Sequence, residues 1–379
     1  MSLKSKLSQG RKKEKNDIDN VDYSLLVIIL MLLCFGLVMV FSASSANAHY
    51  VQGDATYFFK RQLIWAVAGL LIMWFVSQFS YKKIKQYANL LFTITIVMLI
   101  LVPFIGIKIN GARRWLGFGS LTFQPSEFAK LTLVLFLAKS ISIFPGRTKQ
   151  LTNGYIRYFI IIVAVAGLVL LQPHMSGAIV IAMGGVAVLF AAGYKIRYFV
   201  ITAMGALPAL LALAIMSPYR LKRITSFLDP FADKLGESWQ IVQSLYAIGS
   251  GGLFGMGLGQ SRQKFLYIPE PQNDFIFAII CEELGFIGAV FVIFLFALLI
   301  WKGIMIAKDA PDEFAALTAT GITSLVAVQV LMNIAVVSSM MPVTGVPLPF
   351  FSYGGSSLVI LLIEMGILLN ISRYTKKTR

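Results

Sequence analysis

Long apolar segments separated by short polar ones run along almost the whole chain. Windows long enough to cross the roughly 30 Å hydrocarbon layer of a bilayer recur from one end to the other. They lie at residues 24–45, 63–80, 88–107, 124–145, 156–172, 177–193, 198–216, 275–301, 316–338 and 355–372. Because backbone polar groups must be satisfied internally in lipid, these windows are predicted to be helices. The pattern therefore predicts an all-α polytopic membrane protein of about ten transmembrane helices.

Composition supports the bilayer as the main solvent. The chain has 379 residues, of which 58% are hydrophobic and only 13% are charged, whereas an ordinary soluble domain has roughly 25% charged residues. The net charge of +16 would suggest nucleic acid as the partner of a soluble protein. Here the basic residues cluster at the ends of apolar segments, where orientation signals lie. We therefore expect membrane lipid and no nucleic acid among the partners.

The distribution of Lys and Arg orients the chain. These residues are more frequent in the connections that share a side with the N-terminus, which places both termini in the cytoplasm. Residues 1–21 are polar and basic and contain no apolar signal-peptide core, so they are expected to form a flexible cytoplasmic tail. Residues 22–379 are then a single transmembrane domain. Cys34 and Cys281 both lie in apolar segments, which argues against a disulfide framework or a zinc site.

Three outer connections stand out. Residues 217–274 form one long extracytoplasmic loop before the eighth helix, and its apolar content suffices to fold it back onto the helices. Loops of this length in compact proteins are usually functional or disordered, and we favour function. Residues 111–125 and 341–355 are apolar and rich in turn residues. Both are expected to be able to dip into the membrane where protein covers them.

The long loop ends at Asp274, directly before the eighth predicted helix. One reading is an N-cap, since Asp is preferred at that position and suits the positive end of the helix dipole. The other reading is a catalytic base placed where the head group of an amphiphilic substrate emerges from the bilayer. The residues alone leave both readings open.

Several charged side chains lie within or beside the predicted helices. Glu127 and Lys130 are three residues apart and share a helix face, so they form either a structural pair or part of a cavity for a charged head group. Intramembrane carboxylates usually face a cavity or a partner, and Glu282, Glu283 and Glu364 belong to this class.

Arg113, Arg114 and Trp115 precede the fourth helix. They suit either an interfacial belt or a phosphate-binding site. The glycines at residues 249–259 do not fit a nucleotide-binding loop, because no stretch reads G-x-G-x-x-G and no βαβ unit surrounds it. They are expected to allow tight turns or close packing of a re-entrant segment.

At this point a family resemblance emerges from several motifs. These are QSLYAIGSGGLFG at 243–255, GLGQSRQK at 257–264, PE at 269–270, DFIFA at 274–278, EELG at 282–285, PVTG at 342–345, SYGGSS at 352–357 and NISR at 370–373. Together they resemble the SEDS family (shape, elongation, division and sporulation), and the FtsW and SpoVE branch more than RodA. The likeness runs from the first helix to the last and leaves out only the basic tail.

The resemblance implies a specific activity and setting. SEDS proteins are peptidoglycan glycosyltransferases in the cytoplasmic membrane of bacteria. They polymerise lipid II, the undecaprenyl-pyrophosphate-linked disaccharide pentapeptide, into β-1,4 glycan strands on the outer face. They act in cell wall biogenesis during elongation (cell shape), division or sporulation, and the family pairs with a class B penicillin-binding protein, a transpeptidase. The family's essential aspartate falls on Asp274.

Forming a β-1,4 bond from an α-linked donor implies inversion by a single displacement, which needs one general base for the acceptor hydroxyl. Asp274 fits that role. The pyrophosphate leaving group gains charge and favours nearby cations. The candidate substrate-binding residues are Arg113, Arg114, Trp115, Glu127, Lys130, Gln243, Arg262 and Lys264. A divalent cation, Mg²⁺ or Mn²⁺, would also help, although the sequence contains no clear metal-ligand cluster.

The chain departs from the family pattern at two positions. Asn273 replaces the common Thr before the catalytic Asp, and both residues can form hydrogen bonds. His174 stands where the family usually has Asp, so that any role there falls to a neutral or cationic imidazole. Two other functions remain alternatives: a lipid II flippase that uses the intramembrane charges, and a non-catalytic scaffold for a transpeptidase.

Overall fold

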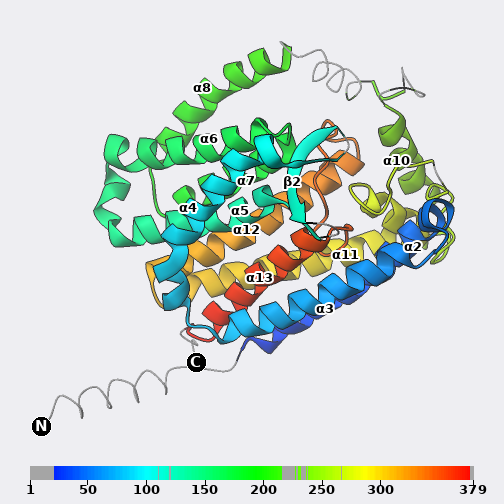
Figure 1. Ribbon diagram of the computed structural model, residues 1–379, viewed down its shortest axis with the longest axis horizontal. Helices are drawn as coiled ribbons and strands as arrows, with labels where there is room; N and C mark the ends of the chain where they lie inside the picture. The colour runs from blue at the N-terminus through cyan, green and yellow to red at the C-terminus, as the bar shows by residue number, and fades with distance from the viewer. Residues whose placement is uncertain are drawn as a thin grey trace, which may run out of the picture.

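The computed structural model describes residues 21–375 except 110, 119–120, 216–226, 228, 232–235, 237 and 266. The described chain is mainly α-helical (Figure 1). Its α-helices are α2 (Tyr23–Gln52), α3 (Tyr57–Gln78), α4 (Tyr81–Ile105), α5 (Pro125–Ile143), α6 (Arg157–Leu170), α7 (Met175–Ala191), α8 (Ile196–Ile215), α10 (Trp239–Ser250), α11 (Ile276–Lys308), α12 (Glu313–Val337) and α13 (Gly355–Ser372). A 3-10 turn (Pro145–Lys149) and a π-helical turn (Leu151–Ile156) connect α5 to α6.

Each of the ten apolar windows overlaps one of these helices, so the predicted all-α polytopic fold is confirmed. Within the described residues, seven helical stretches are long and apolar enough to cross a bilayer on their own. The α5 helix is less apolar because it carries Glu127, Lys130 and Lys139. The predicted cytoplasmic tail lies outside the described residues except for Val21.

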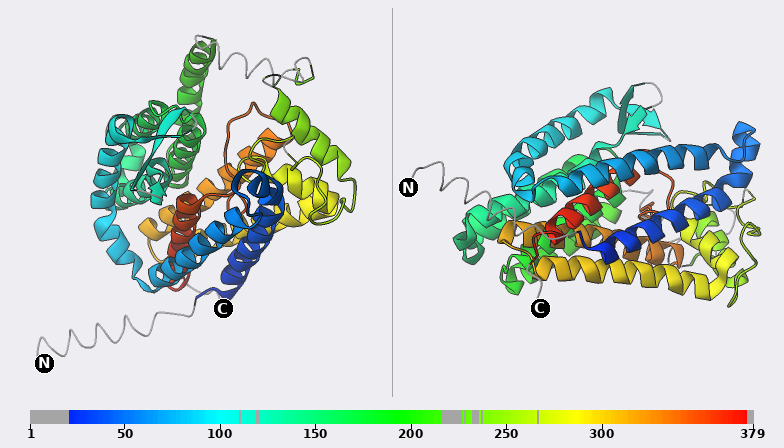
Figure 2. Two further views of the ribbon diagram at one scale, coloured as in Figure 1. Left: turned by 45° about the vertical axis from the view of Figure 1, so that its right-hand side comes forward. Right: turned by 90° about the horizontal axis from the view of Figure 1, so that it is seen from below.

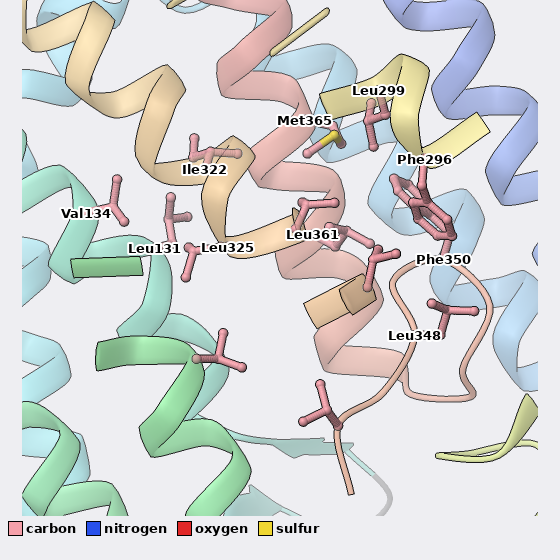
Figure 3. Packing of buried hydrophobic residues seen from close by; sticks show 14 of the residues in the cluster. Leu131, Val134, Phe296, Leu299, Ile322, Leu325, Leu348, Phe350, Leu361 and Met365 are labelled. Carbon is pink, nitrogen blue, oxygen red and sulfur yellow. The ribbon is translucent and has the colours of Figure 1, made fainter. Parts of the chain in front are cut away.

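The hydrophobic core extends through most of the described helices, and α5, α11, α12 and α13 meet at its centre (Figure 3). Figure 3 shows Leu131 of α5, Ile322 of α12, Leu361 of α13 and Phe296 of α11 pointing toward this centre. The α13 helix packs most extensively against α3 and also contacts α2, α5, α11 and α12. By contrast, α8 lies at the edge of the bundle (Figure 2). The well-packed centre thus holds α12 and α13, whose outer ends surround the candidate site.

The connection between α4 and α5 contains strands that the sequence did not predict. Residues 111–125, which were expected to be able to dip into the membrane, belong largely to a three-stranded antiparallel sheet of β1 (Ile107–Ile109), β2 (Ala112–Phe118) and β3 (Leu121–Phe123). Lys108 pairs with Arg113, and Gly117 pairs with Thr122. Pairing between the strands satisfies part of the backbone of this segment, and β2 also contacts α4 and α5.

The protein covers much of the connection between α12 and α13. Val346, Leu348, Phe350 and Phe351 are all buried. Figure 3 shows Leu348 and Phe350 on this segment, next to Phe296 of α11. The turn therefore enters the helix bundle from its outer end and contributes to the core.

The α11 helix is broken at Gly285, whose backbone has φ of 67° and ψ of −166°. The glycine-rich segment after α10 fills the break. Met256 and Gly257 donate backbone hydrogen bonds to the carbonyls of Glu282 and Glu283, at 2.9 and 3.0 Å. Backbone groups freed by a broken helix are thus satisfied by a neighbouring segment. The predicted close packing of the glycine run is confirmed, since side chains at Gly251 and Gly255 would collide with the backbone of α11.

Candidate functional site

Asp274 lies two residues before α11, at the end of the long loop. The N-cap position is Phe275, and no side chain caps this end of the helix. The N-cap reading of Asp274 is therefore wrong. Asp274 is partly exposed, and its Oδ2 atom lies beside Gly345.

Hydrogen bonds to three consecutive carbonyls fix the backbone around Asp274. The side-chain amide of Asn333 in α12 donates to the carbonyl of Asp274 at 2.8 Å. The hydroxyl of Ser352 donates to the carbonyl of Asn273 at 2.6 Å. The backbone amide of Tyr353 donates to the carbonyl of Gln272 at 2.8 Å. Two elements distant in sequence thus hold the aspartate in place, as a reacting group requires.

Gly345 provides the space that the carboxylate occupies. A Cβ atom on Gly345 would lie 2.9 Å from Oδ2 of Asp274, and the residue has a φ of 63°. Asn333 also donates to the carbonyl of Val346 at 2.7 Å. The side-chain amide of Asn333 therefore connects the backbone of Asp274 to the segment that contains Gly345 and Val346.

Two clefts meet at Asp274. The larger one, of about 860 Å³, is lined by the ends of α2 and α3, by β2, and by residues 268–274 and 353–357. The smaller one, of about 720 Å³, is lined by the end of α6, the start of α7, and residues 343–345. Both clefts include Arg114, His174, Glu270, Asn273 and Asp274. Asp274 is thus accessible from two spaces at once.

The structure separates the two predicted arginines. Neighbouring residues of a strand point to opposite faces, and Arg113 accordingly donates to the carbonyls of Pro103 and Phe104 at the end of α4. Arg114 lines both clefts and donates to the carbonyls of Gln172 and Pro173. Trp115 lines the larger cleft. Of this trio, Arg114 and Trp115 share a cleft with Asp274.

Glu127 and Lys130 form a buried ion pair with an N–O distance of 2.8 Å. Glu127 lines the larger cleft, whereas Lys130 lines a small cavity of about 30 Å³ beneath it. Glu364 of α13 and Gln329 of α12 line the same cavity. The pair therefore connects the floor of the cleft to a polar space inside the helix bundle.

The remaining predicted residues have structural surroundings. Lys264 lines the larger cleft, but its ammonium group lies 2.9 Å from Glu283 and 2.6 Å from the carbonyl of Gly259. Arg262 has an exposed side chain, and its backbone amide donates to Glu282. Gln243 is buried in α10 and lines neither cleft. Arg262 and Gln243 are thus not brought to Asp274.

His174 lies between α6 and α7, in the wall that the two clefts share. Its Nδ1 atom is 3.2 Å from the amide nitrogen of Gln124 and 3.1 Å from the hydroxyl of Ser126. Burial, reinforced by the charge of Arg114, lowers the pKa of His174 to about 4. The imidazole is therefore neutral near pH 7. Of the neutral and cationic forms that the sequence left open, the structure favours the neutral one.

Several site residues were not assigned from the sequence. Arg61 and Trp65 of α3 line the larger cleft, and the guanidinium of Arg61 donates to the hydroxyl of Tyr57 at 2.7 Å. Asn333, Ser352 and Gly345 position Asp274. Gly345 belongs to the PVTG motif and Ser352 to the SYGGSS motif, so the family motifs could have identified both residues. Asn333 is a single polar residue in an apolar helix and belongs to no such motif.

A divalent cation has no ready ligand set in the described part of the chain. No group of three or more His, Cys, Asp or Glu residues is arranged there to hold a metal ion. Mg²⁺ usually keeps several water ligands and binds through one or two carboxylates together with substrate phosphates. We therefore derive no chemical step through a metal ion.

Comparison with known proteins connects this geometry to a family. The family model for the cell cycle proteins FtsW, RodA and SpoVE matches residues 23–377. This chain belongs to that family. The predicted membership in the SEDS family is confirmed, and the chain is accordingly a multi-pass protein of the cytoplasmic membrane.

The relatives include both named branches. Stage V sporulation protein E of Bacillus subtilis is 45% identical over 357 residues, which cover 94% of this chain and 98% of that protein. A probable peptidoglycan glycosyltransferase FtsW of Trichlorobacter lovleyi is 42% identical over 353 residues and covers 93% of each chain. These names support the predicted FtsW and SpoVE branch of the family.

Solved structures share the fold over nearly the whole chain. A chain of a peptidoglycan synthase complex that coordinates polymerization and crosslinking has a TM-score of 0.79 at 32% identity, and the match covers 94% of this chain and 99% of that one. Thermus thermophilus RodA, a rod shape determining protein, has a TM-score of 0.71 at 30% identity, with 94% and 98% covered. The described helices therefore follow the family arrangement.

Proposed function

We propose that this chain is a peptidoglycan glycosyltransferase that polymerises lipid II on the outer face of the cytoplasmic membrane, in cell division or sporulation. The observation that carries the proposal is the position of Asp274 where two clefts meet. A polymerase must hold two lipid-linked saccharides with their reacting ends together. A fixed carboxylate accessible from two spaces suits that task.

The larger cleft suits a pyrophosphate. Arg61 and Arg114 line it, and Trp65 and Trp115 supply aromatic faces beside them. Guanidinium groups bind phosphate oxygens with well-defined geometry. The donor lipid II, whose pyrophosphate leaves in the reaction, is therefore assigned to this cleft. Glu127 also lines this cleft, and its ion pair with Lys130 neutralises its charge.

In the proposed reaction, the acceptor's 4-hydroxyl oxygen attacks the anomeric carbon of the donor sugar. The carboxylate of Asp274 takes the hydroxyl proton as the new C–O bond forms, because a sugar hydroxyl is too weakly acidic to ionise beforehand. The bond from the anomeric carbon to the phosphate oxygen breaks in the same step. The electron pair leaves with undecaprenyl pyrophosphate, whose growing charge Arg114 and Arg61 stabilise.

A transpeptidase partner is part of the proposal. The chain resembles a component of a peptidoglycan synthase complex that coordinates polymerization and crosslinking. New glycan strands need crosslinking close to where they are made. We expect a class B penicillin-binding protein to bind this chain and to act on the strands it produces.

The test is synthesis of glycan from labelled lipid II by the purified protein, alone and with its cognate transpeptidase. We expect a ladder of products on a gel that a muramidase cleaves, since this enzyme hydrolyses the β-1,4 bond. Absence of polymer under both conditions, together with movement of lipid II across liposome bilayers, would support the flippase instead. Absence of both activities with intact transpeptidase binding would support the scaffold.

A further inference from the structure

The shared wall of the two clefts contains a histidine that the proposed mechanism does not use. His174 is about nine-tenths buried and lies at the start of α7. Its ring packs against the Cα of Gly177, one turn further along the helix, where a larger residue would collide with it. The hydrogen bonds at Nδ1 come from the protein side, from Gln124 and Ser126. The ring is thus held in one orientation.

The other ring nitrogen is available to a ligand. Within the described residues, Nε2 of His174 has no hydrogen-bond partner, and it is not enclosed by protein. A ring nitrogen that is accessible from a cleft and has no partner in the protein can form a hydrogen bond with water or with a ligand. Because the pKa of His174 is lowered to about 4, the imidazole offers a hydrogen bond without adding charge.

The smaller cleft has the lining of a saccharide site. It presents hydroxyl, amide and carboxylate groups from Ser176, Gln240, Asn273, Thr344, Glu270 and Asp274. Among its described lining residues, Arg114 is the single Lys or Arg, and the two carboxylates of Glu270 and Asp274 outnumber it. Such a surface favours a neutral, hydroxyl-rich group over a phosphate.

We propose that the smaller cleft binds the saccharide of a lipid-linked substrate and that His174 contacts it through a hydrogen bond between Nε2 and a sugar hydroxyl or N-acetyl group. The inference rests on the proposed function, because it concerns the substrate of the same site. It adds a substrate-binding residue and assigns a chemical class to one of the two clefts.

Chemical modification tests the contact without measuring catalysis. The chain has two histidines, and His49 is exposed at the end of α2. In a His49→Gln protein, diethyl pyrocarbonate can therefore modify one histidine, His174, and mass spectrometry measures the extent. We expect lipid II to slow this modification at least about fivefold. Undecaprenyl pyrophosphate, which lacks the saccharide, should not slow it.

Equal protection by both ligands would assign His174 to the pyrophosphate and overturn the proposal. Absence of protection by lipid II would overturn it as well. This measurement uses the native histidine, so it does not depend on a variant at position 174 that folds poorly. It also remains informative if the wild-type protein makes no polymer, an outcome that would count against the proposed function instead.

Kinetics give a second test in protein that polymerises lipid II. The loss of one neutral hydrogen bond lowers kcat/KM about five- to tenfold, and we expect this of His174→Ala. His174→Gln keeps an uncharged amide at this position and should stay within about threefold of wild type. His49→Ala is the matched control and should behave as wild type. An unchanged kcat/KM in folded His174→Ala would contradict the contact, whereas the polymerase assignment would stand.

Discussion

The ammonium group of Lys264 lies 2.9 Å from the carboxylate of Glu283, and both side chains are buried. Ser42 donates a hydrogen bond to the same carboxylate at 2.6 Å, and the backbone amide of Ser261 donates at 3.3 Å. The pair joins the loop after α10 to the helix that follows Asp274. The charge of Lys264 is thus neutralised within the protein, although the residue borders the larger cleft.

This pairing predicts a structural role for Lys264. Lys264→Met should lower the free energy of unfolding by about 3–5 kcal/mol, because it leaves Glu283 buried without its partner. The double variant Lys264→Met, Glu283→Gln should recover part of the loss. Thermal unfolding in detergent measures both effects. A Lys264→Met protein of unchanged stability that makes no polymer would instead assign Lys264 to the substrate.

The break in α11 depends on Gly285. A side chain at this position would meet the backbone nitrogen of Gly255 and the carbonyl of Leu253, at a φ of 67° that disfavours other residues. Gly285→Ala should therefore destabilise the protein by at least about 1–3 kcal/mol. Gly249→Ala in α10 is the control, since nothing lies within 4 Å of its Cβ position. Equal melting temperatures for the two variants would contradict this role.

Gly345 should control the position of the Asp274 carboxylate. A Cβ at Gly345 would lie 2.9 Å from Oδ2 of Asp274, so Gly345→Ala displaces the carboxylate. Displacements near 1 Å can cost about a hundredfold in rate, and we expect kcat to fall by at least tenfold. Gly53→Ala is the control, because its φ of 72° is similar but its surroundings are open. A full polymerisation rate in Gly345→Ala would show that the carboxylate does not need this space.

His174 makes the stability of the protein depend on pH. Because the pKa in the folded protein is about 4 and the unfolded value is near 6.5, the unfolded chain takes up a proton first as the pH falls. The neutral form of His174 therefore contributes about 3 kcal/mol to the free energy of unfolding. This contribution is fully present above pH 6.5 and is lost as the pH falls toward 4. His174→Gln should lose less stability than wild type across this range. Identical acid sensitivity of the two proteins in thermal unfolding would contradict the lowered pKa.

The sequence predicted helices most reliably where an apolar segment ends abruptly. The window 355–372 coincides with α13, because glycines precede it and Arg373 follows. The predicted window 63–80 begins six residues after the true start of α3, because this helix starts at Tyr57 and includes Lys60 and Arg61. Backbone hydrogen bonds continue a helix through polar residues that hydropathy excludes. The break in α11 was not predicted, because the window 275–301 was treated as one helix although Glu282, Glu283 and Gly285 interrupt its apolar pattern.

The site was predictable in part. Asp274 followed from the motifs, and Arg114 and Trp115 followed from their position before a helix. The opposite directions of Arg113 and Arg114 could not be predicted, because the segment was not recognised as a strand. Asn333, which holds the carbonyl of Asp274 from 59 residues away, depends on packing that a single sequence does not reveal.

The most direct test of the account compares wild type with Asp274→Asn for synthesis of glycan polymer from labelled lipid II. Asparagine keeps the size of the side chain but cannot take the hydroxyl proton. Asp309→Asn, at the far end of the same helix, is the matched control and should make polymer normally. We predict no polymer from an Asp274→Asn protein that is folded and binds its transpeptidase. Polymer made at the wild-type rate by that protein would contradict Asp274 as the general base.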